Sequence, residues 1–325
     1  MPDSPRSAFE LIDQHPPLSD LHAEALAGLR RAQKALPPKL FYDQKGSELF
    51  VEITRLPEYY PTRVEIGIME KNVTEMVSFI QDHAVLVDLG SGASRKARIL
   101  LDETKSRVTY MPLDISLDHL EKSARAVSED YPNLRVVAVC SDYTTALDIP
   151  RWDDYAQRVL FFPGSTIGNF EPAEAKQFIS YLAGRLTTND GMLIGVDLEK
   201  DISIVEAAYD DSLGVTAEFN RNILRRINRE LGADFDPESF EHVAFYNKEH
   251  HRIEMHLRSV RDQAFHIGED QIEFKESETI HTENSYKYSV ERFRRIVEGT
   301  GFSIVQTWTD PDQMFSVHYL VDELA

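Results

Sequence analysis

The chain has 325 residues, of which 42% are hydrophobic and 28% charged, an ordinary balance for a globular protein with a sizeable core. Its formal net charge is −20, and an acidic surface repels phosphate backbones, so we expect no nucleic-acid partner. No apolar run is long enough to span a membrane, so no membrane partner is expected. The single cysteine, Cys140, lies in an apolar run and predicts a buried thiol in a reducing, cytoplasmic compartment.

Residues 1 to about 65 predict a helical N-terminal segment that is interrupted by prolines. One buried helix face is expected early in this segment, because four apolar side chains recur at helical spacing: Leu21, Ala25, Leu26 and Leu29. Further along, Pro57 and Pro61 bracket Tyr59 and Tyr60 in what we predict to be an extended loop. The two rings either line a binding site or pack the loop against itself, and the composition allows both.

A strongly apolar run at residues 85–89 predicts a strand that is buried on both faces, as in a parallel sheet. Gly90 and Gly92 follow at its carboxyl end, and a helical pattern resumes at Lys96. Glycine permits a positive φ and lets a ligand approach the backbone closely. This is typical of the first turn of a doubly wound sheet, where nucleotide-like ligands bind. Arg95 stands where a dinucleotide fingerprint needs a third Gly or Ala, so a dinucleotide is disfavoured.

Two later strands end in side chains that suit a nucleoside. The strand predicted at 108–114 ends at Asp114, whose carboxylate can accept hydrogen bonds from both hydroxyls of a ribose. The strand predicted at 134–140 is followed by Asp142 and Tyr143, which suit the amino group and the ring face of adenine. Because no phosphate-binding motif accompanies them, the combination favours S-adenosylmethionine over NAD. The same residues are also compatible with a Rossmann-like sheet whose turns merely use glycine and aspartate.

A fourth buried strand at 157–163 opens into a second glycine-edged turn, from Gly164 to Asn169, and a fifth strand is predicted at 191–198. The carboxyl ends of parallel strands meet at one edge of a sheet, so Gly164 is expected at the same edge as Gly90. Asn169 either contacts a ligand there or caps the following helix, and the sequence allows both.

Residues 198–287 differ in character from the rest of the chain. A helical stretch is followed by short alternating segments, which predict antiparallel strands. The α/β rhythm then returns and closes with an antiparallel strand at 315–321. We therefore predict an α/β protein with a Rossmann-like domain made of residues 1–197 and 288–325, which carries an inserted α+β substrate-binding domain at 198–287.

No metal site is predicted, because no spacing typical of metal ligands occurs. The adjacent His250 and His251 fall on a predicted turn among charged residues, where a solvated surface explains them.

Several longer strings are more specific than the glycine turn. They are Leu36–Lys39 with Phe41 and Tyr42, Arg55–Arg63, Leu89–Gly92, Gly164–Asn169, Gly214–Thr216 with Phe219–Asn222, Arg252–Met255 and Thr282–Ser285. Through these strings the chain resembles, over nearly its whole length, the histidine-specific Nα-methyltransferases of ergothioneine biosynthesis, which make hercynine. The resemblance implies a class I methyltransferase fold with S-adenosylmethionine as the cofactor.

The resemblance also implies a set of functional residues. Around the histidine it places Tyr59, Gly164, Asn169, Tyr209, Met255, Glu283 and Ser285. On the cofactor side it places Tyr42, Gly90, Lys96, Asp114, Asp142 and Tyr143. Tyr42 and Asn169 are the two residues expected to act in catalysis.

The chemistry required of these residues is the alignment of a neutral amine with a sulfonium methyl group, which positioning and partial desolvation can favour without a dedicated base. Glu283 suits an imidazole N–H and Ser285 the second ring nitrogen. The expected partners are small molecules, namely L-histidine and its mono- and dimethyl forms, and a monomer is expected. Two alternatives are a methyltransferase of this architecture acting on another amino acid such as tryptophan, and a non-catalytic cofactor-binding protein.

Overall fold

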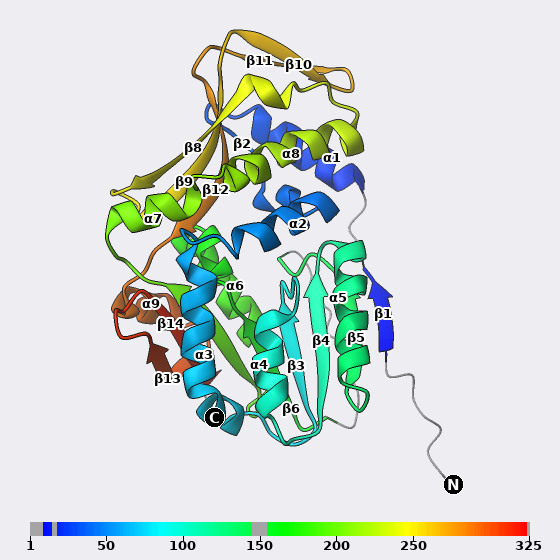
Figure 1. Cartoon of the computed structure of the whole chain (residues 1–325), viewed down its shortest axis with the longest axis vertical. Coiled ribbons are helices and arrows are strands. Elements are labelled where there is room, and N and C mark those ends of the chain that lie inside the picture. The colour runs from blue at the N-terminus through cyan, green and yellow to red at the C-terminus, as the bar shows by residue number, and fades with distance from the viewer. Residues whose placement is uncertain (1–8, 15–17, 145–154, 324–325) are drawn as a thin grey trace. The chain divides into compact units, whose positions relative to one another are not determined.

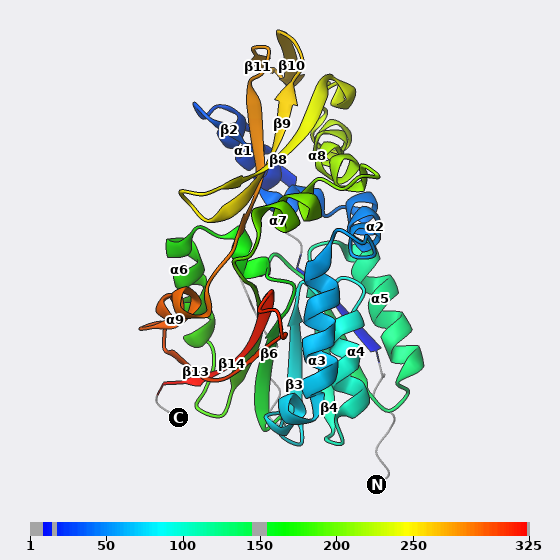
Figure 2. The same cartoon turned by 60° about the vertical axis from the view of Figure 1, so that its left-hand side comes forward.

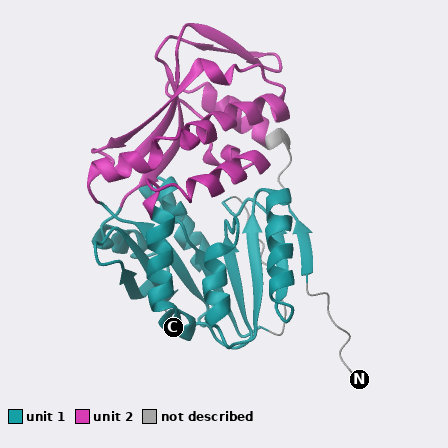
Figure 3. Ribbon diagram, viewed as in Figure 1, with its two compact units in different colours: residues 1–15, 61–199, 288–325 teal, residues 16–60, 200–287 magenta. Residues whose placement is uncertain are grey.

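The computed structural model describes residues 9–14, 18–144 and 155–323. Its contacts divide the chain into two compact units, which Figure 3 shows in different colours. Unit 1 comprises residues 1–15, 61–199 and 288–325, and unit 2 comprises residues 16–60 and 200–287. Residues 16–60 were predicted to belong to the Rossmann-like domain, and the structure places them in unit 2 instead.

Unit 1 is built on an eight-stranded sheet with the order β1-β5-β4-β3-β6-β7-β14-β13 (Figure 1). Its strands are β1 Phe9–Asp13, β3 Ala84–Leu89, β4 Val108–Asp114, β5 Arg135–Cys140, β6 Gln157–Phe162, β7 Gly191–Asp197, β13 Phe302–Thr309 and β14 Phe315–Asp322. Among these strands, β14 alone runs in the opposite direction to the others, so its pairings with β7 and β13 are antiparallel and the remaining pairings are parallel. The five predicted parallel strands and the closing antiparallel strand are confirmed. The chain winds outwards from β3 first to β4 and β5 and then to β6 and β7, so the turn after β3 lies at a topological switch point.

Helices cover both faces of this sheet (Figures 1 and 2). One face carries α3 Tyr60–Ser78, α4 Arg95–Glu103 and α5 Leu117–Asp130, and the other carries α6 Pro172–Ala183 and α9 Val290–Val297. The short 3₁₀ helix η2, Thr166–Asn169, follows β6. Apolar side chains of α3, α4 and α5 form one cluster with the strands, including Met69, Leu100 and Leu120. Among the helices of the described residues, none is long and apolar enough to cross a bilayer.

The predicted N-terminal helical segment is partly wrong, because residues Phe9–Asp13 form strand β1. This strand pairs in parallel with Val136–Cys140 of β5 and so becomes the edge of the sheet. The backbone donors and acceptors of β5 decide the conformation of this short segment over its local pattern. The helix expected in the same segment is confirmed as α1, Leu18–Leu29, and its predicted apolar face is buried. Residues 1–8 and 15–17 of the predicted segment lie outside the described residues.

The predicted extended loop around the two tyrosines is wrong from Tyr60 onwards, where helix α3 begins. Pro61 is the second residue of this helix. At a helix start the missing N–H of proline costs nothing, because the first amides have no partner within the helix. Proline therefore marks a boundary here rather than an interruption.

Unit 2 contains a four-stranded sheet with the order β2-β12-β9-β8 and a separate hairpin, β10-β11. Besides α1, its elements are β2 Lys34–Ala35, η1 Pro38–Phe41, α2 Gln44–Ile53, α7 Ile202–Tyr209, α8 Val215–Leu231, η3 Pro237–Ser239, β8 Phe240–Asn247, β9 Arg252–Ser259, β10 Gln263–Ile267, β11 Asp270–Phe274 and β12 Thr279–Tyr286. Helices α7 and α8 contact β8 and β9. The β2–β12 pairing and the packing of η1 and α2 against α8 explain why residues 16–60 belong to this unit.

A fully buried amide, that of Asn220 on α8, ties the helix to three strands. Its nitrogen donates to His242 Nδ1 on β8 at 2.8 Å and to the His256 carbonyl on β9 at 3.1 Å, and its oxygen accepts from Thr282 on β12 at 2.8 Å. Since His242 Nδ1 accepts, its Nε2 carries the hydrogen and donates to the Tyr209 carbonyl at 2.8 Å. Burial lowers the pKa of His242, which agrees with a neutral ring.

Candidate active site

In unit 1, the turn after β3 is shaped for close approach by a ligand. Gly90 has φ +76°, and a side-chain carbon placed there would lie 3.3 Å from the Tyr143 hydroxyl, so the tyrosine covers one side of the turn. A carbon placed on Gly92 would meet nothing within 4 Å. Asp114, at the end of the neighbouring strand, accepts from the Gly92 amide at 3.0 Å and from the Ser116 amide at 3.1 Å. Three predicted cofactor residues, Gly90, Asp114 and Tyr143, are thus brought together at this turn.

The next predicted residue, Lys96, is paired with a buried carboxylate that sequence reasoning missed. Its Nζ lies 2.5 Å from Glu65 of α3, which is 1% exposed. The same carboxylate accepts from the Gly164 amide at 2.9 and 3.0 Å, and a side-chain carbon on Gly195 would lie 2.1 Å from it. Glu65 therefore connects Lys96 to the turn after β6. It lies two residues after the specific string that ends at Arg63, which is the signal that was available in the sequence.

Asp88, two residues before Gly90, is a second buried carboxyl group without a predicted role. The Tyr110 hydroxyl donates to its Oδ2 at 2.7 Å, whereas its Oδ1 has no hydrogen-bond partner among the described residues. Burial raises the pKa of Asp88 to about 7, although the Tyr110 hydrogen bond and the charge of Lys96 act in the opposite direction. At neutral pH this group is poised between its two protonation states.

The two remaining predicted residues of unit 1, Asp142 and Asn169, lie in the segments that follow β5 and β6. Asp142 is buried and accepts from the Thr144 amide at 3.0 Å, within its own turn. Asn169 is half-buried at the end of η2. Helix α6 has Glu171 as its N-cap, and the Glu171 amide donates to Glu174 at 3.1 Å. The capping alternative for Asn169 is therefore excluded.

In unit 2, an irregularity in β12 decides which side chains share a face of the sheet. His281 is paired with His256, but Glu283 is paired with Met255, so Thr282 is an extra residue in β12. Residues directly opposite each other on paired strands point to the same side. Glu283 and Ser285 therefore share the face of Met255, whereas a regular strand would have placed Glu283 on the face of His281. The Thr282 hydroxyl, bonded to Asn220 and to the Met255 carbonyl at 3.0 Å, holds this bulge.

Tyr209 and Tyr59 join this group. The hydroxyls of Tyr209 and Ser285 are 2.7 Å apart, and the rings of Tyr59 and Tyr209 lie edge to face at 6.2 Å. Lys287, which is fully buried, donates to Ser285 at 2.8 Å and to Tyr209 at 3.0 Å. Sequence reasoning missed Lys287, although it follows the Thr282–Ser285 string by two residues.

Tyr42 is predicted on the cofactor side but belongs to unit 2, whereas the other five cofactor-side residues belong to unit 1. Its ring makes edge contacts with Phe50 and Phe219, each at 5.8 Å. The next residue, Asp43, caps α2 through the Gly46 amide at 2.7 Å and accepts from Asn222 at 2.8 Å. Contacts from α8 thus fix the backbone that carries Tyr42.

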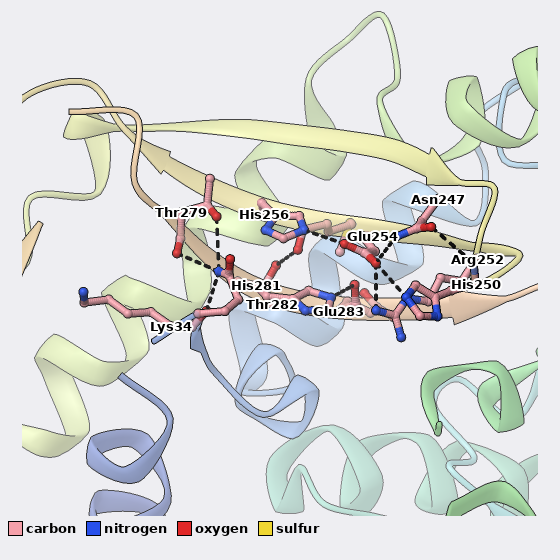
Figure 4. Close-up of polar contacts among 12 residues, drawn as sticks. Lys34, Asn247, His250, Arg252, Glu254, His256, Thr279, His281, Thr282 and Glu283 are labelled. Atoms are coloured by element: carbon pink, nitrogen blue, oxygen red, sulfur yellow. Dashed lines mark hydrogen bonds and ion pairs between the residues drawn. The ribbon is translucent and has the colours of Figure 1, made fainter. Parts of the chain in front are cut away.

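Glu254, His256 and His281 form a cluster whose potential ligand atoms lie within 4.8 Å of one another, although no metal was predicted (Figure 4). Arg252 already pairs with Glu254 at 2.7 Å. The two imidazole rings are stacked at 4.6 Å and 12°, and their in-plane lone pairs therefore run nearly parallel instead of converging on an ion. Burial acts to raise the pKa of Glu254, but hydrogen bonds from Arg252 and His256 lower it to about 2. The cluster is better explained as a network that joins β9 to β12.

The donor set of unit 1 fits S-adenosylmethionine. The open side of the glycine turn admits a nucleoside, and each Asp114 oxygen keeps a lone pair for a ribose hydroxyl beside the amide it already accepts from. Tyr143 offers a ring, and Lys96 offers a cation for a carboxylate. A mostly parallel sheet with this turn at its switch point, and with these side chains around it, defines the chain as an α/β protein of the nucleoside-binding class.

Comparison with known proteins narrows this class. The model of the family "Histidine-specific methyltransferase, SAM-dependent" matches residues 21–322, and the chain belongs to that family. It is 42% identical over 296 residues to histidine N-alpha-methyltransferase of Mycobacterium tuberculosis, covering 89% of this chain and 91% of that protein. It is 41% identical over 314 residues to the protein of the same name from Mycolicibacterium smegmatis, covering 93% and 97%. Ergothioneine biosynthesis protein 1 of Neurospora crassa is 34% identical over 295 residues, which are 88% of this chain but 33% of that protein.

The protonation of Asp88 gives a stability prediction. Its pKa rises from 3.8 in the unfolded chain to about 7 in the folded one, so its protonated form favours folding and this contribution is lost as pH rises through that window. Asp88→Asn cannot ionise. We therefore expect the difference in melting temperature, variant minus unsubstituted protein, to increase from pH 4 to pH 7 and to stay constant above pH 7. Scanning calorimetry measures both melting temperatures.

Asp82→Asn is the matched control. Asp82 is exposed, and the amide and guanidinium of Arg107 lower its pKa, so it is ionised throughout the same range and its variant should give a pH-independent difference. A difference for Asp88→Asn that is equally flat would show that Asp88 ionises normally.

Proposed function

We propose that this protein transfers three methyl groups from S-adenosylmethionine to the α-amino group of L-histidine to give hercynine, the first step of ergothioneine biosynthesis. The observation that carries the proposal is the β12 bulge, which puts Glu283 and Ser285 on the face of Met255, with Tyr209 bonded to Ser285. These are an acceptor, a hydroxyl and a polarisable side chain, which suit an imidazole ring. The names of the relatives support the same substrate.

On the cofactor side, the proposal assigns the ribose to Asp114, the adenine to Asp142 and Tyr143, and the amino-acid carboxylate to Lys96. When bound, S-adenosylmethionine supplies an electrophilic methyl group on a positively charged sulfur. Glu65 keeps Lys96 and the Gly164 amide in a fixed relation, because one carboxylate accepts from both.

The acceptor must be a neutral amine with its lone pair directed at the methyl carbon. We assign Tyr42 and Asn169 to holding this amine, and the Asn169 amide, which has two N–H donors, also to donating to the substrate carboxylate. Partial desolvation next to a sulfonium favours the neutral amine, so the loss of one proton before each transfer needs no dedicated base.

Anchoring the substrate at its carboxylate and at its ring leaves the amine free to rotate between transfers. The glycine-edged turn at Gly164 offers backbone rather than a bulky side chain, which we take to favour added methyl groups; a side-chain carbon there would lie 3.2 Å from Lys96 Nζ. Both features support acceptance of mono- and dimethylhistidine as intermediates. We further propose that the protein is a monomer in the cytoplasm. Burial raises the pKa of the Cys140 thiol to about 12, and a buried, protonated thiol agrees with a reducing compartment.

The proposed function is tested by mass spectrometry of histidine incubated with the protein and excess S-adenosylmethionine. We expect the trimethylated betaine as the end product, with the mono- and dimethyl forms appearing first and then being consumed. No methylated histidine would reject the function, and accumulation of the monomethyl form as the end product would reject the two-anchor explanation.

Asp114 provides a test of the cofactor site. Asp114→Asn keeps an acceptor oxygen for the backbone but removes the charge, so S-adenosylmethionine should bind about 1.5–3 kcal/mol more weakly, the range for hydrogen bonds to a charged group. Calorimetric titration measures this, with Asp118→Asn on the exposed face of α5 as the control that should bind normally. Equal affinity in both variants would place the ribose elsewhere.

Glu283 provides a test of substrate selectivity. Glu283→Ala removes the proposed acceptor of an imidazole N–H, so kcat/KM for histidine should fall. The fall should correspond to about 2–4 kcal/mol of lost transition-state stabilisation and should arise mainly from a higher KM. Activity on tryptophan should fall much less or rise. Glu276→Ala, an exposed change in the same unit, is the control. Histidine turnover that is insensitive to Glu283→Ala would remove the main physical support for the histidine assignment.

A further inference from the structure

Lys287 is a fully buried lysine whose ammonium group contacts two residues assigned to the substrate. Its Nζ donates to Ser285 at 2.8 Å and to Tyr209 at 3.0 Å, and it lies 4.7 Å from the centre of the Tyr209 ring. The two hydroxyls are themselves 2.7 Å apart. The three polar groups therefore form a closed triangle inside unit 2, with Ser285 only 3% exposed.

The hydrogen-bond inventory of this triangle is restricted by the lysine. An ammonium group has three N–H donors and no lone pair, so both hydroxyl oxygens must accept from it. The bond between Tyr209 and Ser285 uses one of the two hydroxyl hydrogens. The other hydroxyl hydrogen is therefore directed at a group outside the triangle.

The choice between the two hydroxyls follows from their lone pairs. A serine oxygen has two lone pairs and can accept from Lys287 and Tyr209 together. A phenol oxygen shares electron density with its ring and is the poorer double acceptor. The favoured order is therefore that Tyr209 accepts from Lys287 and donates to Ser285, and that Ser285 donates outwards.

We propose that Lys287 is a positioning residue that makes Ser285 a hydrogen-bond donor to the substrate ring, and so selects histidine with a neutral imidazole. The inference rests on the proposed histidine substrate. A neutral imidazole has one N–H, which Glu283 can accept, and one lone pair, which Ser285 can meet with its hydrogen. An imidazolium ion has two N–H groups, and one of them would face the Ser285 hydrogen.

Other ionisable groups flank the triangle, and the proposal has to account for them. The ionisable groups on the elements that carry or adjoin the triangle are Glu283 on β12, His242 on β8, Glu206 on α7, Asp210 and Asp211 after α7, and Arg252 at the start of β9. His242 is neutral and bonded to the Tyr209 carbonyl, and Glu206 accepts from the Tyr246 amide at 2.9 Å. Asp211 accepts from the Thr216 amide in the first turn of α8 at 2.7 Å, and Arg252 pairs with Glu254. Glu283 itself would prefer an imidazolium, so the selection of the neutral ring has to come from Ser285.

The test is the pH profile of kcat/KM for histidine at saturating S-adenosylmethionine. Above pH 7, kcat/KM should rise about tenfold per pH unit as the amine deprotonates. Below the imidazole pKa of about 6.5, kcat/KM should fall by a further factor of about ten per pH unit, because less histidine has a neutral ring. In Lys287→Met the hydroxyls are free to reverse and accept from an imidazolium. The additional loss below pH 6.5 should then level off within about one pH unit, because the imidazolium reacts as well, while the imidazole pKa of free histidine stays the same. Lys287→Gln, which keeps two N–H donors without the charge, should lie between the two.

Lys200→Met is the matched control. Lys200 also belongs to unit 2, donates to the Tyr60 hydroxyl at 2.7 Å and lies over that ring at 4.3 Å, but it has no assigned role in the reaction. Its variant should keep the additional acid loss of the unsubstituted protein. A purely structural role for Lys287 would lower kcat/KM at every pH and leave the additional acid loss unchanged, which would overturn the inference. So would the absence of the additional acid loss in the unsubstituted protein, whatever the variants do, whereas absence of histidine turnover would reject the proposed function itself.

Discussion

The extra residue at Thr282 is the constraint on which the candidate substrate site of unit 2 depends. In a regular strand, Glu283 would share a face with His281 and His256, where Glu254 already forms an ion pair with Arg252. The bulge turns the carboxylate to the face of Met255 and Ser285 instead. The bonds of Asn220 and Thr282 hold it in place. The residues proposed to recognise a ring and the ion pair that supports the sheet are thus separated onto two sides of the same strands.

The two units divide the chemistry between them. Unit 1 presents carboxylates, an aromatic ring and a lysine at the carboxyl ends of parallel strands, which is the chemistry of a nucleoside with an amino-acid tail. Unit 2 presents hydroxyls and a carboxylate on an antiparallel sheet. In both units a buried charge directs its neighbours: Glu65 accepts from Lys96 and the Gly164 amide, and Lys287 donates to Tyr209 and Ser285. Burying either charged group without partners would be costly, so the hydrogen bonds of Glu65 and Lys287 offset the cost of their burial.

Much of unit 1 could be predicted from the sequence, because a buried parallel strand is an uninterrupted apolar run and its turn needs glycine. The strand ending at Asp114 and the turn at Gly90 are examples. Strand β1 could not be predicted, since only the edge of β5 makes that short segment extended. The start of α3 was missed because Pro61 was interpreted as part of a loop, although proline is equally suited to a first helical turn.

The residues of the candidate site were predicted from specific strings in the sequence. These strings do not show which residues contact one another. The register that pairs Met255 with Glu283 depends on a contact between strands, which no local pattern encodes. Glu65 and Lys287 were missed because charged residues are expected at the surface, whereas both are buried. A buried charged residue next to a predicted site residue can be identified only when the pairing of the strands is known.

The state of the bound imidazole tests the account most directly. Histidine labelled with ¹⁵N in its ring can be observed by NMR when bound to the protein with S-adenosylhomocysteine at neutral pH. The account predicts one protonated and one unprotonated ring nitrogen, matching the acceptor Glu283 and the donor Ser285. Two protonated ring nitrogens, the signature of an imidazolium, would contradict it.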